Sequence, residues 1–220
     1  MNICTRLTSF LVLIVLVLMV SACRPRIVIG PEQTFTMDVP SPASSNVTNV
    51  ALEMVVPQGA LALAGGAEGL IEGAITYNAA EYEPQMTNGG GALLIRQTAP
   101  RPKLVFVSVQ NNLINQWDLR LGDAPMNFEI RLDSGDHTVE FADSLPTNLN
   151  VNVNASMGNL ELISAPGLAA QVILGEKSNP EVKSYGDWTQ NGSIYETGSG
   201  SAALTITVNM TLGTLTLDNK

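Results

Sequence analysis

The stretch LTITVNMTLGTLTL, residues 204–217, decides the fold class. Apolar side chains occupy every second position over Leu204–Leu212 and alternate with Thr or Asn. A period of two is typical of a β-strand with one buried face and one solvated face. After Gly213 the apolar positions continue at Leu215 and Leu217, one residue out of phase. A change of phase at a glycine predicts a tight corner or a bulge between two strands.

Three further stretches share this arrangement of two alternating apolar residues, a glycine-containing interval, and two more apolar residues in the opposite phase. They are Leu52 and Met54 with Leu61 and Leu63, Ile130 and Leu132 with Val139 and Phe141, and Val151 and Val153 with Leu160 and Leu162. In the last two copies, Ile130 corresponds to Val151 and Leu132 to Val153. Between residues 50 and 220 no capped apolar stripe of helical period is long enough to predict an α-helix.

This correspondence gives a period of about 21 residues, made of short strands and glycine corners, and it predicts an all-β, solenoid-like stack of short coils. Such a stack buries continuous rows of Leu and Val, so the chain needs few aromatic residues. The alternative is an antiparallel β-sandwich, in which short alternating strands also recur. The ends of a solenoid expose unpaired strand edges, and we expect the strands of residues 204–217 to form one of them.

The N-terminus has the three parts of an export signal: Arg6, the apolar run Phe10–Val20, and small residues at 21 and 22. A helix of eleven residues would be about 16 Å long, which is too short for a bilayer core of about 30 Å. The sequence VSAC, residues 20–23, resembles a bacterial lipobox. It predicts cleavage before Cys23 and acylation of the Cys23 thiol, with palmitate or related chains as the membrane anchor.

These features divide the chain into three parts. Residues 1–22 are the predicted lipoprotein signal peptide. Residues 23–49 are the predicted lipidated N-terminus and tether, in which the short apolar groups 27–29 and 35–37 leave open that part of the segment packs on the domain. Residues 50–220 are the predicted β-domain. The expected location is the extracytoplasmic face of the cytoplasmic membrane or of an outer membrane.

Charge and residue chemistry exclude several classes of function. The net charge is −9, which disfavours nucleic acid as a partner. His137 is the only histidine, and we expect it in an exposed turn, so neither a His-rich metal site nor a Ser-His-Asp triad is predicted. No catalytic, cofactor-binding or metal-binding residue is assigned, and no cofactor is expected.

Two groups of carboxylates and a set of aromatic residues are the remaining candidates for sites. The densest acidic cluster, predicted to be a solvated face with calcium as the alternative, is Asp133, Asp136, Glu140 and Asp143. A pair such as Glu129 and Glu140 could suggest glycoside hydrolysis, but almost any acidic β-protein has such pairs. Six aromatics are expected to cover the core rather than to line a sugar groove: Trp117, Trp188, Tyr77, Tyr82, Tyr185 and Tyr195.

The segment Ala51–Met86 resembles the N-terminal part of the bacterial toast-rack family through a strand, a glycine, an L-x-L pair, GGA at residues 65–67, LIEG at residues 70–73 and YN at residues 77–78. The stretches 90–97, 116–121 and 187–217 continue the likeness. The resemblance implies a right-handed stack of β-coils, related to the cell-wall-active-antibiotic response proteins of the bacterial envelope. The chain departs from the family pattern at DSGDH, residues 133–137, which leaves the coil register there open.

The leading prediction is therefore a membrane-anchored, non-catalytic lipoprotein of the cell envelope, with a structural or interaction role and a link to the envelope stress response. Its partners would be the membrane, through the lipid at Cys23, and an envelope protein or a second copy of itself. The alternatives are a carbohydrate-binding or adhesive surface module and a polysaccharide-acting enzyme.

Overall fold

The structure is a computed structural model that describes residues 27–41, 47–97, 112–146, 148–199 and 203–220. These residues form one sheet of fifteen β-strands and a single 3₁₀ turn, η1 (Ala80–Tyr82), with no α-helix among them. The all-β prediction is confirmed.

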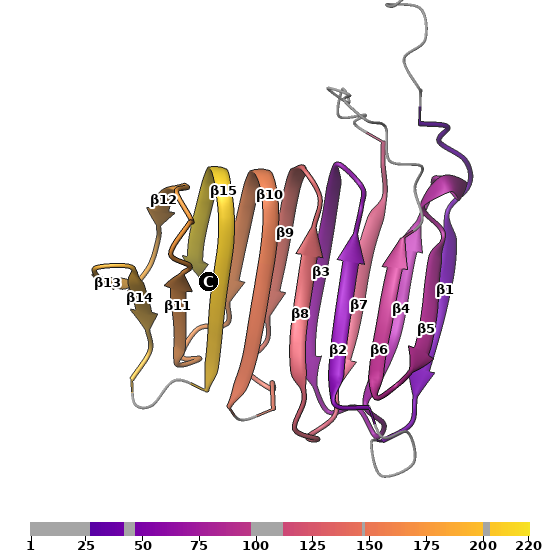
Figure 1. Cartoon of the computed structure of the whole chain (residues 1–220), viewed down its shortest axis with the longest axis horizontal. Coiled ribbons are helices and arrows are strands. Elements are labelled where there is room, and N and C mark those ends of the chain that lie inside the picture. Colours follow the sequence, from indigo (N-terminus) through magenta and orange to yellow (C-terminus); the bar gives the residue numbers. More distant parts are fainter. Residues whose placement is uncertain (1–26, 42–46, 98–111, 147, 200–202) are drawn as a thin grey trace, which may run out of the picture.

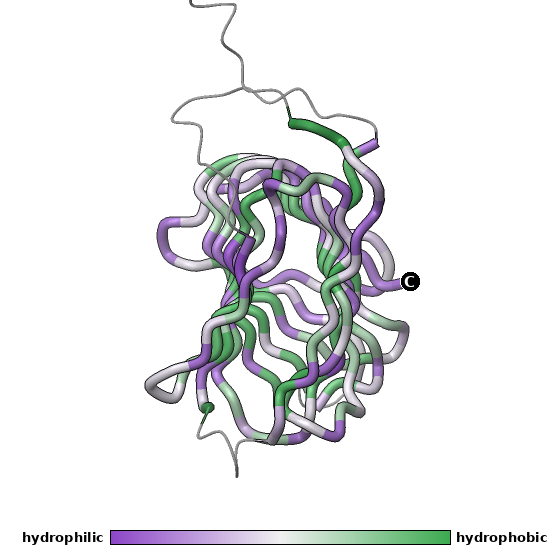
Figure 2. Tube along the Cα trace, turned by 90° about the vertical axis from the view of Figure 1, so that its right-hand side faces the viewer, coloured by the Kyte–Doolittle hydropathy of each residue, from purple (hydrophilic) through white to green (hydrophobic). Residues whose placement is uncertain are grey.

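The sheet forms two walls that face each other across the core (Figures 1 and 2). The first wall is made of β5 (Pro84–Gly89), β6 (Ala92–Gln97), β2 (Asn49–Met54), β8 (Asn127–Leu132), the first halves of β10 (Leu149–Ser164) and β15 (Leu204–Asn219), β11 (Ala170–Leu174), β14 (Ile194–Thr197) and β13 (Thr189–Asn191). The second wall is made of β1 (Gln33–Val39), β4 (Ile71–Tyr77), β7 (Asn115–Leu121), β3 (Gln58–Gly65), β9 (Gly135–Phe141), the second halves of β10 and β15, and β12 (Glu181–Ser184).

Strand β15 shows how the sequence pattern produces the two walls. Leu204, Ile206, Val208 and Met210 are buried from the first wall, and Leu215 and Leu217 are buried from the second. The alternating Thr and Asn side chains are partly or fully exposed. The predicted change of phase at Gly213 is therefore the corner at which the strand passes from one wall to the other.

Glycines are stacked at this corner in three successive coils. A Cβ on Gly158 would lie 1.9 Å from the carbonyl oxygen of Gly135, and a Cβ on Gly213 would lie 1.9 Å from that of Gly158. Gly158 and Gly213 also have φ values of +129° and +123°, which L-residues rarely adopt. Backbones at the corner thus approach closely enough that only glycine fits, and Gly135 of the DSGDH stretch belongs to this row.

The step between coils is longer than the repeat that the sequence predicts. Val151 pairs with Phe128 rather than with Ile130, and the register partners Asp136 and Asn159 lie 23 residues apart. The shorter predicted step was wrong because it aligned apolar residues without aligning the corner glycines, and in the structure the corner glycines stack on one another.

The order of coils in space is not their order in the chain. Strand β15 lies between β10, which it pairs with in parallel, and β11 and β12, which pair with its other edge. The prediction that residues 204–217 form an exposed edge was therefore wrong. The outermost strands at this end of the stack are β12 and β13 (Figure 1).

The N-terminal segment that the sequence left open between tether and strand is partly folded. Strand β1 pairs antiparallel with β4 along its whole length. Ile27, Met37 and Val39 are buried in the core. The folded part of the chain therefore begins no later than Ile27.

Candidate functional site

The predicted lipidation site Cys23 and the predicted signal segment lie outside the described residues. Within the described ranges, no helix has the length and apolar character needed to cross a membrane.

His137 is buried, not exposed in a turn as predicted, with only 4% of its surface accessible. It lies on β9 two residues before Val139, and it faces the core like its register partner Leu160. Its other register partner is Gly59 on β3, which has no side chain. The imidazole thus occupies a position that a leucine fills in the next coil.

A cluster of polar side chains surrounds this position and joins the two walls. Gln97, on the first wall, donates from Nε2 to Oδ1 of Asn115 on the second wall at 2.7 Å. Trp117 donates from Nε1 to the same oxygen at 3.0 Å. Asn115 Nδ2 lies 3.7 Å from the sulfur of Met54, and a Cβ on Gly59 would lie 2.6 Å from that same nitrogen. The missing side chain at Gly59 makes room for Asn115.

Not every polar atom of this cluster has a partner. His137 donates from Nε2 to the carbonyl oxygen of Asp133 at 3.2 Å, which leaves Nδ1 as an acceptor. Among the described residues, neither His137 Nδ1 nor Gln97 Oε1 has a hydrogen-bond partner. Burial lowers the pKa of His137, because the imidazolium form loses its hydration, although the Asp133 carbonyl and the carboxylates of Asp136 and Asp133 act in the opposite direction.

The outer face of the second wall carries a groove above this cluster. It crosses β7, β3, β9, β10 and β15 near the corner. Its floor includes Gly59 and the exposed Ala60 on β3. The polar side chains that line it are Gln58, Gln116, Asp136, Thr138, Asn159, Glu161 and Thr216. Ile114 adds an apolar side chain at one end, and His137 and Asn115 line the groove from the inside.

The acidic cluster predicted at residues 133–143 is solvated. Asp133, Asp136, Glu140 and Asp143 are all exposed. Asp136 accepts a hydrogen bond from Asn159 at 2.8 Å and so forms part of the groove wall. Among the residues that the structure describes, no three His, Cys, Asp or Glu side chains gather closely enough to hold a metal ion.

The two carboxylates considered for glycoside hydrolysis are not brought together. Glu129 is on β8 in the first wall, whereas Glu140 is on β9 in the second. Glu129 instead pairs with Arg131 at 2.6 Å and accepts a hydrogen bond from Asn154 at 2.8 Å. Hydrogen bonding to Arg131 lowers the pKa of Glu129. These contacts tie the carboxylate to the surface of its own wall.

The aromatic residues cover the core, as predicted. Trp117, Tyr77, Tyr82 and Tyr195 are buried, and Trp188 packs partly buried against the core. Tyr185 is the exception, with 56% of its surface exposed. The six therefore do not form an aromatic platform for sugar stacking.

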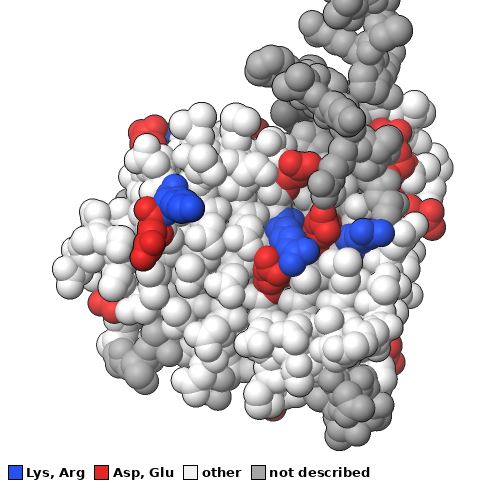
Figure 3. All heavy atoms as spheres, viewed as in Figure 1, with Lys and Arg blue, Asp and Glu red and all other residues white. Residues whose placement is uncertain are grey.

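Positive and negative side chains are mixed on the visible outer face of the first wall. In Figure 3 the Lys and Arg side chains on this face lie beside Asp or Glu, and most of the remaining surface is uncharged. Such a face offers little attraction to a charged polymer.

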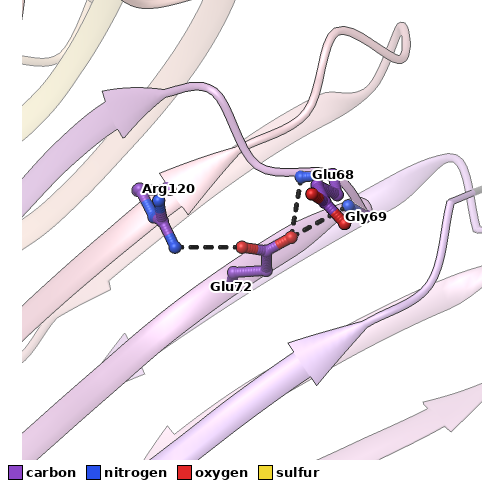
Figure 4. A network of polar contacts seen from close by, with 4 residues as sticks. All are labelled: Glu68, Gly69, Glu72 and Arg120. Atoms are coloured by element: carbon purple, nitrogen blue, oxygen red, sulfur yellow. Dashed lines mark hydrogen bonds and ion pairs between the residues drawn. The ribbon is translucent and has the colours of Figure 1, made fainter.

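Glu72, at the far end of the second wall, fixes a turn rather than a site (Figure 4). Its Oε1 accepts hydrogen bonds from the backbone N–H of Glu68 at 2.7 Å and of Gly69 at 3.1 Å, and its Oε2 pairs with Arg120 at 3.1 Å. The two backbone hydrogen bonds are the main reason that the pKa of Glu72 is lowered, with a smaller effect from Arg120.

The fold defines a class: all-β proteins made of stacked coils around an apolar core. The chain belongs to the toast-rack family, because the family model for the "N-terminal domain of toast_rack, DUF2154" matches residues 28–166. No curated protein sequence matches the chain.

The matches to solved structures include the following two. The first, a "putative cell adhesion protein" from Clostridium sporogenes, has a TM-score of 0.54 and 17% identity, and the match covers 86% of this chain and 99% of that one. The second, a "putative adhesin" from Bacteroides fragilis, has a TM-score of 0.32 and 12% identity, over 86% of this chain and 97% of that one. The first likeness supports the fold.

Proposed function

We propose that this protein is a non-catalytic surface module that is held on the extracytoplasmic side of a membrane by lipid on Cys23 and binds a partner through its outer face. The observation that carries this proposal is the groove on the second wall, which is built from side chains of five neighbouring strands above a closed core. The toast-rack family and the fold shared with a structure described as a putative cell adhesion protein support it.

Stacked strands give such a module a rigid surface. Interior strands β3, β7, β9 and β10 each pair with a strand on both sides, so their backbone groups are already hydrogen-bonded. Binding therefore depends on the side chains that point outward. These side chains stand on a scaffold whose two walls are joined by the Gln97–Asn115 hydrogen bond.

The proposed anchor would hold the domain close to the bilayer. Ile27 is already buried in the core, four residues after Cys23. Four extended residues span at most about 14 Å. A lipidated Cys23 would thus hold the β-stack next to the headgroups. A flexible tether over all of residues 23–49, as the sequence suggested, would instead let the domain move farther from the membrane.

The anchor is tested by the intact mass of the protein from membranes, compared with a Cys23→Ser variant. We expect a chain that starts at Cys23 and carries acyl chains, and we expect this species to be absent from the variant. A chain that keeps residues 1–22 without lipid would contradict the anchor. Cleavage without lipid would make the protein a secreted module and contradict the anchor alone.

The binding role is tested by coating beads with the full chain, purified in detergent, and measuring attachment to cells of the source organism and to their isolated envelopes. Beads coated with heat-unfolded chain serve as the control. Attachment that requires the folded chain supports the role, whereas equal attachment by both kinds of bead contradicts it. A link to the envelope stress response, suggested by the family resemblance, is tested separately by deleting the gene and measuring growth with cell-wall-active antibiotics.

A further inference from the structure

We infer that the groove across β7, β3, β9, β10 and β15 binds an extended chain of neutral sugars lying along the stack. This inference rests on the proposed function as a surface module, and it names the site and the ligand class of that module. It is carried by the groove's geometry and by its charge.

The groove presents outward side chains in rows that follow the strand register. Gln116, Ala60, Thr138, Glu161 and Thr216 form a single row across five adjacent strands. Adjacent strands are about 4.8 Å apart, so the row is about 19 Å long. A second row, Gln58, Asp136 and Asn159, borders it on the corner side. Regular spacing of this kind suits a polymer with a repeating unit rather than a compact small molecule.

The small residue in the first row creates the depression. Ala60 is exposed and lies between the longer side chains of Gln116 and Thr138. The other outward positions of β3 beyond Gln58 are also alanines, at residues 62 and 64. The row is therefore lowest at Ala60, and the longer side chains of Gln116 and Thr138 stand on either side of it.

The polar groups of the groove suit hydroxyl groups. Amides and hydroxyls both donate to and accept from sugar hydroxyls, carboxylates accept from them, and no Lys or Arg is among the described residues that line the groove. A described lining without a cation disfavours phosphorylated or sulfated polymers. Glu161 already lies 3.5 Å from Lys220 Nζ, and its Oε2 lies 3.4 Å from Thr138 Oγ1, so its charge is partly balanced. Hydrogen bonding rather than net charge thus dominates the row.

The backbone excludes the main alternative, an extended peptide added as a strand. Strands β7, β3, β9, β10 and β15 are all interior at the groove, each with a partner on both sides. No strand edge is open at this place for β-addition. Among the described residues of the groove, Ile114 is the one that is at once large, apolar and exposed, and it offers contact to the C–H face of a sugar ring.

The test uses the full chain purified in detergent and an array of immobilised oligosaccharides with neutral, amino and sulfated members of increasing length. We expect binding to neutral members, stronger with length up to about 19 Å and little changed by added salt. Ala60→Trp places a bulky side chain in the middle of the row and should weaken binding at least tenfold. Ala92→Trp is the matched control, because Ala92 is an exposed alanine of a doubly paired strand on the opposite wall. Circular dichroism and thermal melting check that both variants fold.

Three results would overturn the inference: no binding to neutral members, equal loss in both variants, or binding confined to sulfated or amino members. The bead assay separates this inference from the proposed function. If beads carrying Ala60→Trp attach to cells as well as the unmodified chain does, the glycan groove is wrong and the surface module stands. If the array binds but folded and unfolded beads attach equally, the surface role is wrong and the groove stands.

Discussion

Replacing Gly158 by alanine places a methyl carbon 1.9 Å from the carbonyl oxygen of Gly135, in the row of stacked corner glycines. Ordinary van der Waals contact begins at 3.4 Å. Strands β9 and β10 would therefore have to separate by about 1.5 Å at the corner, which stretches nearby interstrand N···O distances beyond the usual limit of about 3.2 Å. The glycine's φ of +129° is also unfavourable for alanine.

The cost follows from these two effects. Holding an L-residue in a rarely populated backbone region costs about 1–3 kcal/mol. Weakening about two interstrand hydrogen bonds costs about 1–3 kcal/mol more. Alanine also lowers the conformational entropy of the unfolded chain, which stabilises the folded state by about 0.4–1 kcal/mol and offsets part of this loss. We expect Gly158→Ala to lower the free energy of unfolding by about 1–5.5 kcal/mol, with a central value of about 3, which is a large share of the roughly 5–15 kcal/mol that is typical of a domain.

Two other glycines separate the two effects in urea unfolding followed by circular dichroism. Gly66 has a φ of +88° and an added Cβ there would meet nothing within 4 Å, so Gly66→Ala should cost about 1–2 kcal/mol from the backbone alone. Gly89 has neither a positive φ nor a close neighbour, so Gly89→Ala should change stability by no more than about 0.5 kcal/mol. A Gly158→Ala loss no larger than that of Gly66→Ala would refute the close-packed corner.

Three further predictions concern other parts of the stack. Burial holds the pKa of His137 below its usual 6.5, so below that pH the unfolded chain binds a proton that the folded chain does not. The free energy of unfolding should therefore fall as the pH drops below 6.5. In urea titrations at several pH values, His137→Leu should remove that part of the pH dependence. The carboxylate of Glu72 is stabilised more by the two backbone N–H groups than by Arg120, so Glu72→Ala should lower the melting temperature at pH 7 more than Arg120→Ala does. The stabilisation by Glu72 is present above its usual pKa of 4.5 and is lost as the pH falls through its lowered pKa in the folded chain. Equal effects of the two variants would contradict this assignment. A chain that stops before Leu204 leaves β10, β11 and β12 without their shared partner, so we expect the single cooperative urea transition to be lost, and an unchanged transition would count against the central place of β15.

The parts of the fold that depend on residues close together in the sequence were predictable. The alternation over Leu204–Leu212 and the change of phase at Gly213 identified both halves of β15 and the corner between them. Which strand pairs with which was not predictable, because parallel pairing across 55 residues, as between Asn154 and Asn209, leaves no local signal. The insertion of β15 beside β10 was missed for this reason.

The buried polar cluster of His137 and Asn115 was missed although a signal was present. His137, Val139 and Phe141 are spaced by two, as are Asn115 and Trp117, so both polar residues share the phase of buried neighbours. A polar residue in the buried phase of a strand predicts a satisfied or functional core group. The acidic residues at 133 and 136 drew attention to a turn instead. The groove itself depends on the register of five strands, and no single stretch of sequence specifies that register.

The position of β15 also determines the order in which the sheet can be completed. Residues 204–219 are made after residues 149–199, yet they lie between β10 on one side and β11 and β12 on the other. Contacts so distant in sequence form slowly, so β11 and β12 join the parallel stack only after β15 has been made. Strand β15 is therefore the link through which the two parts of the sheet become one cooperative unit.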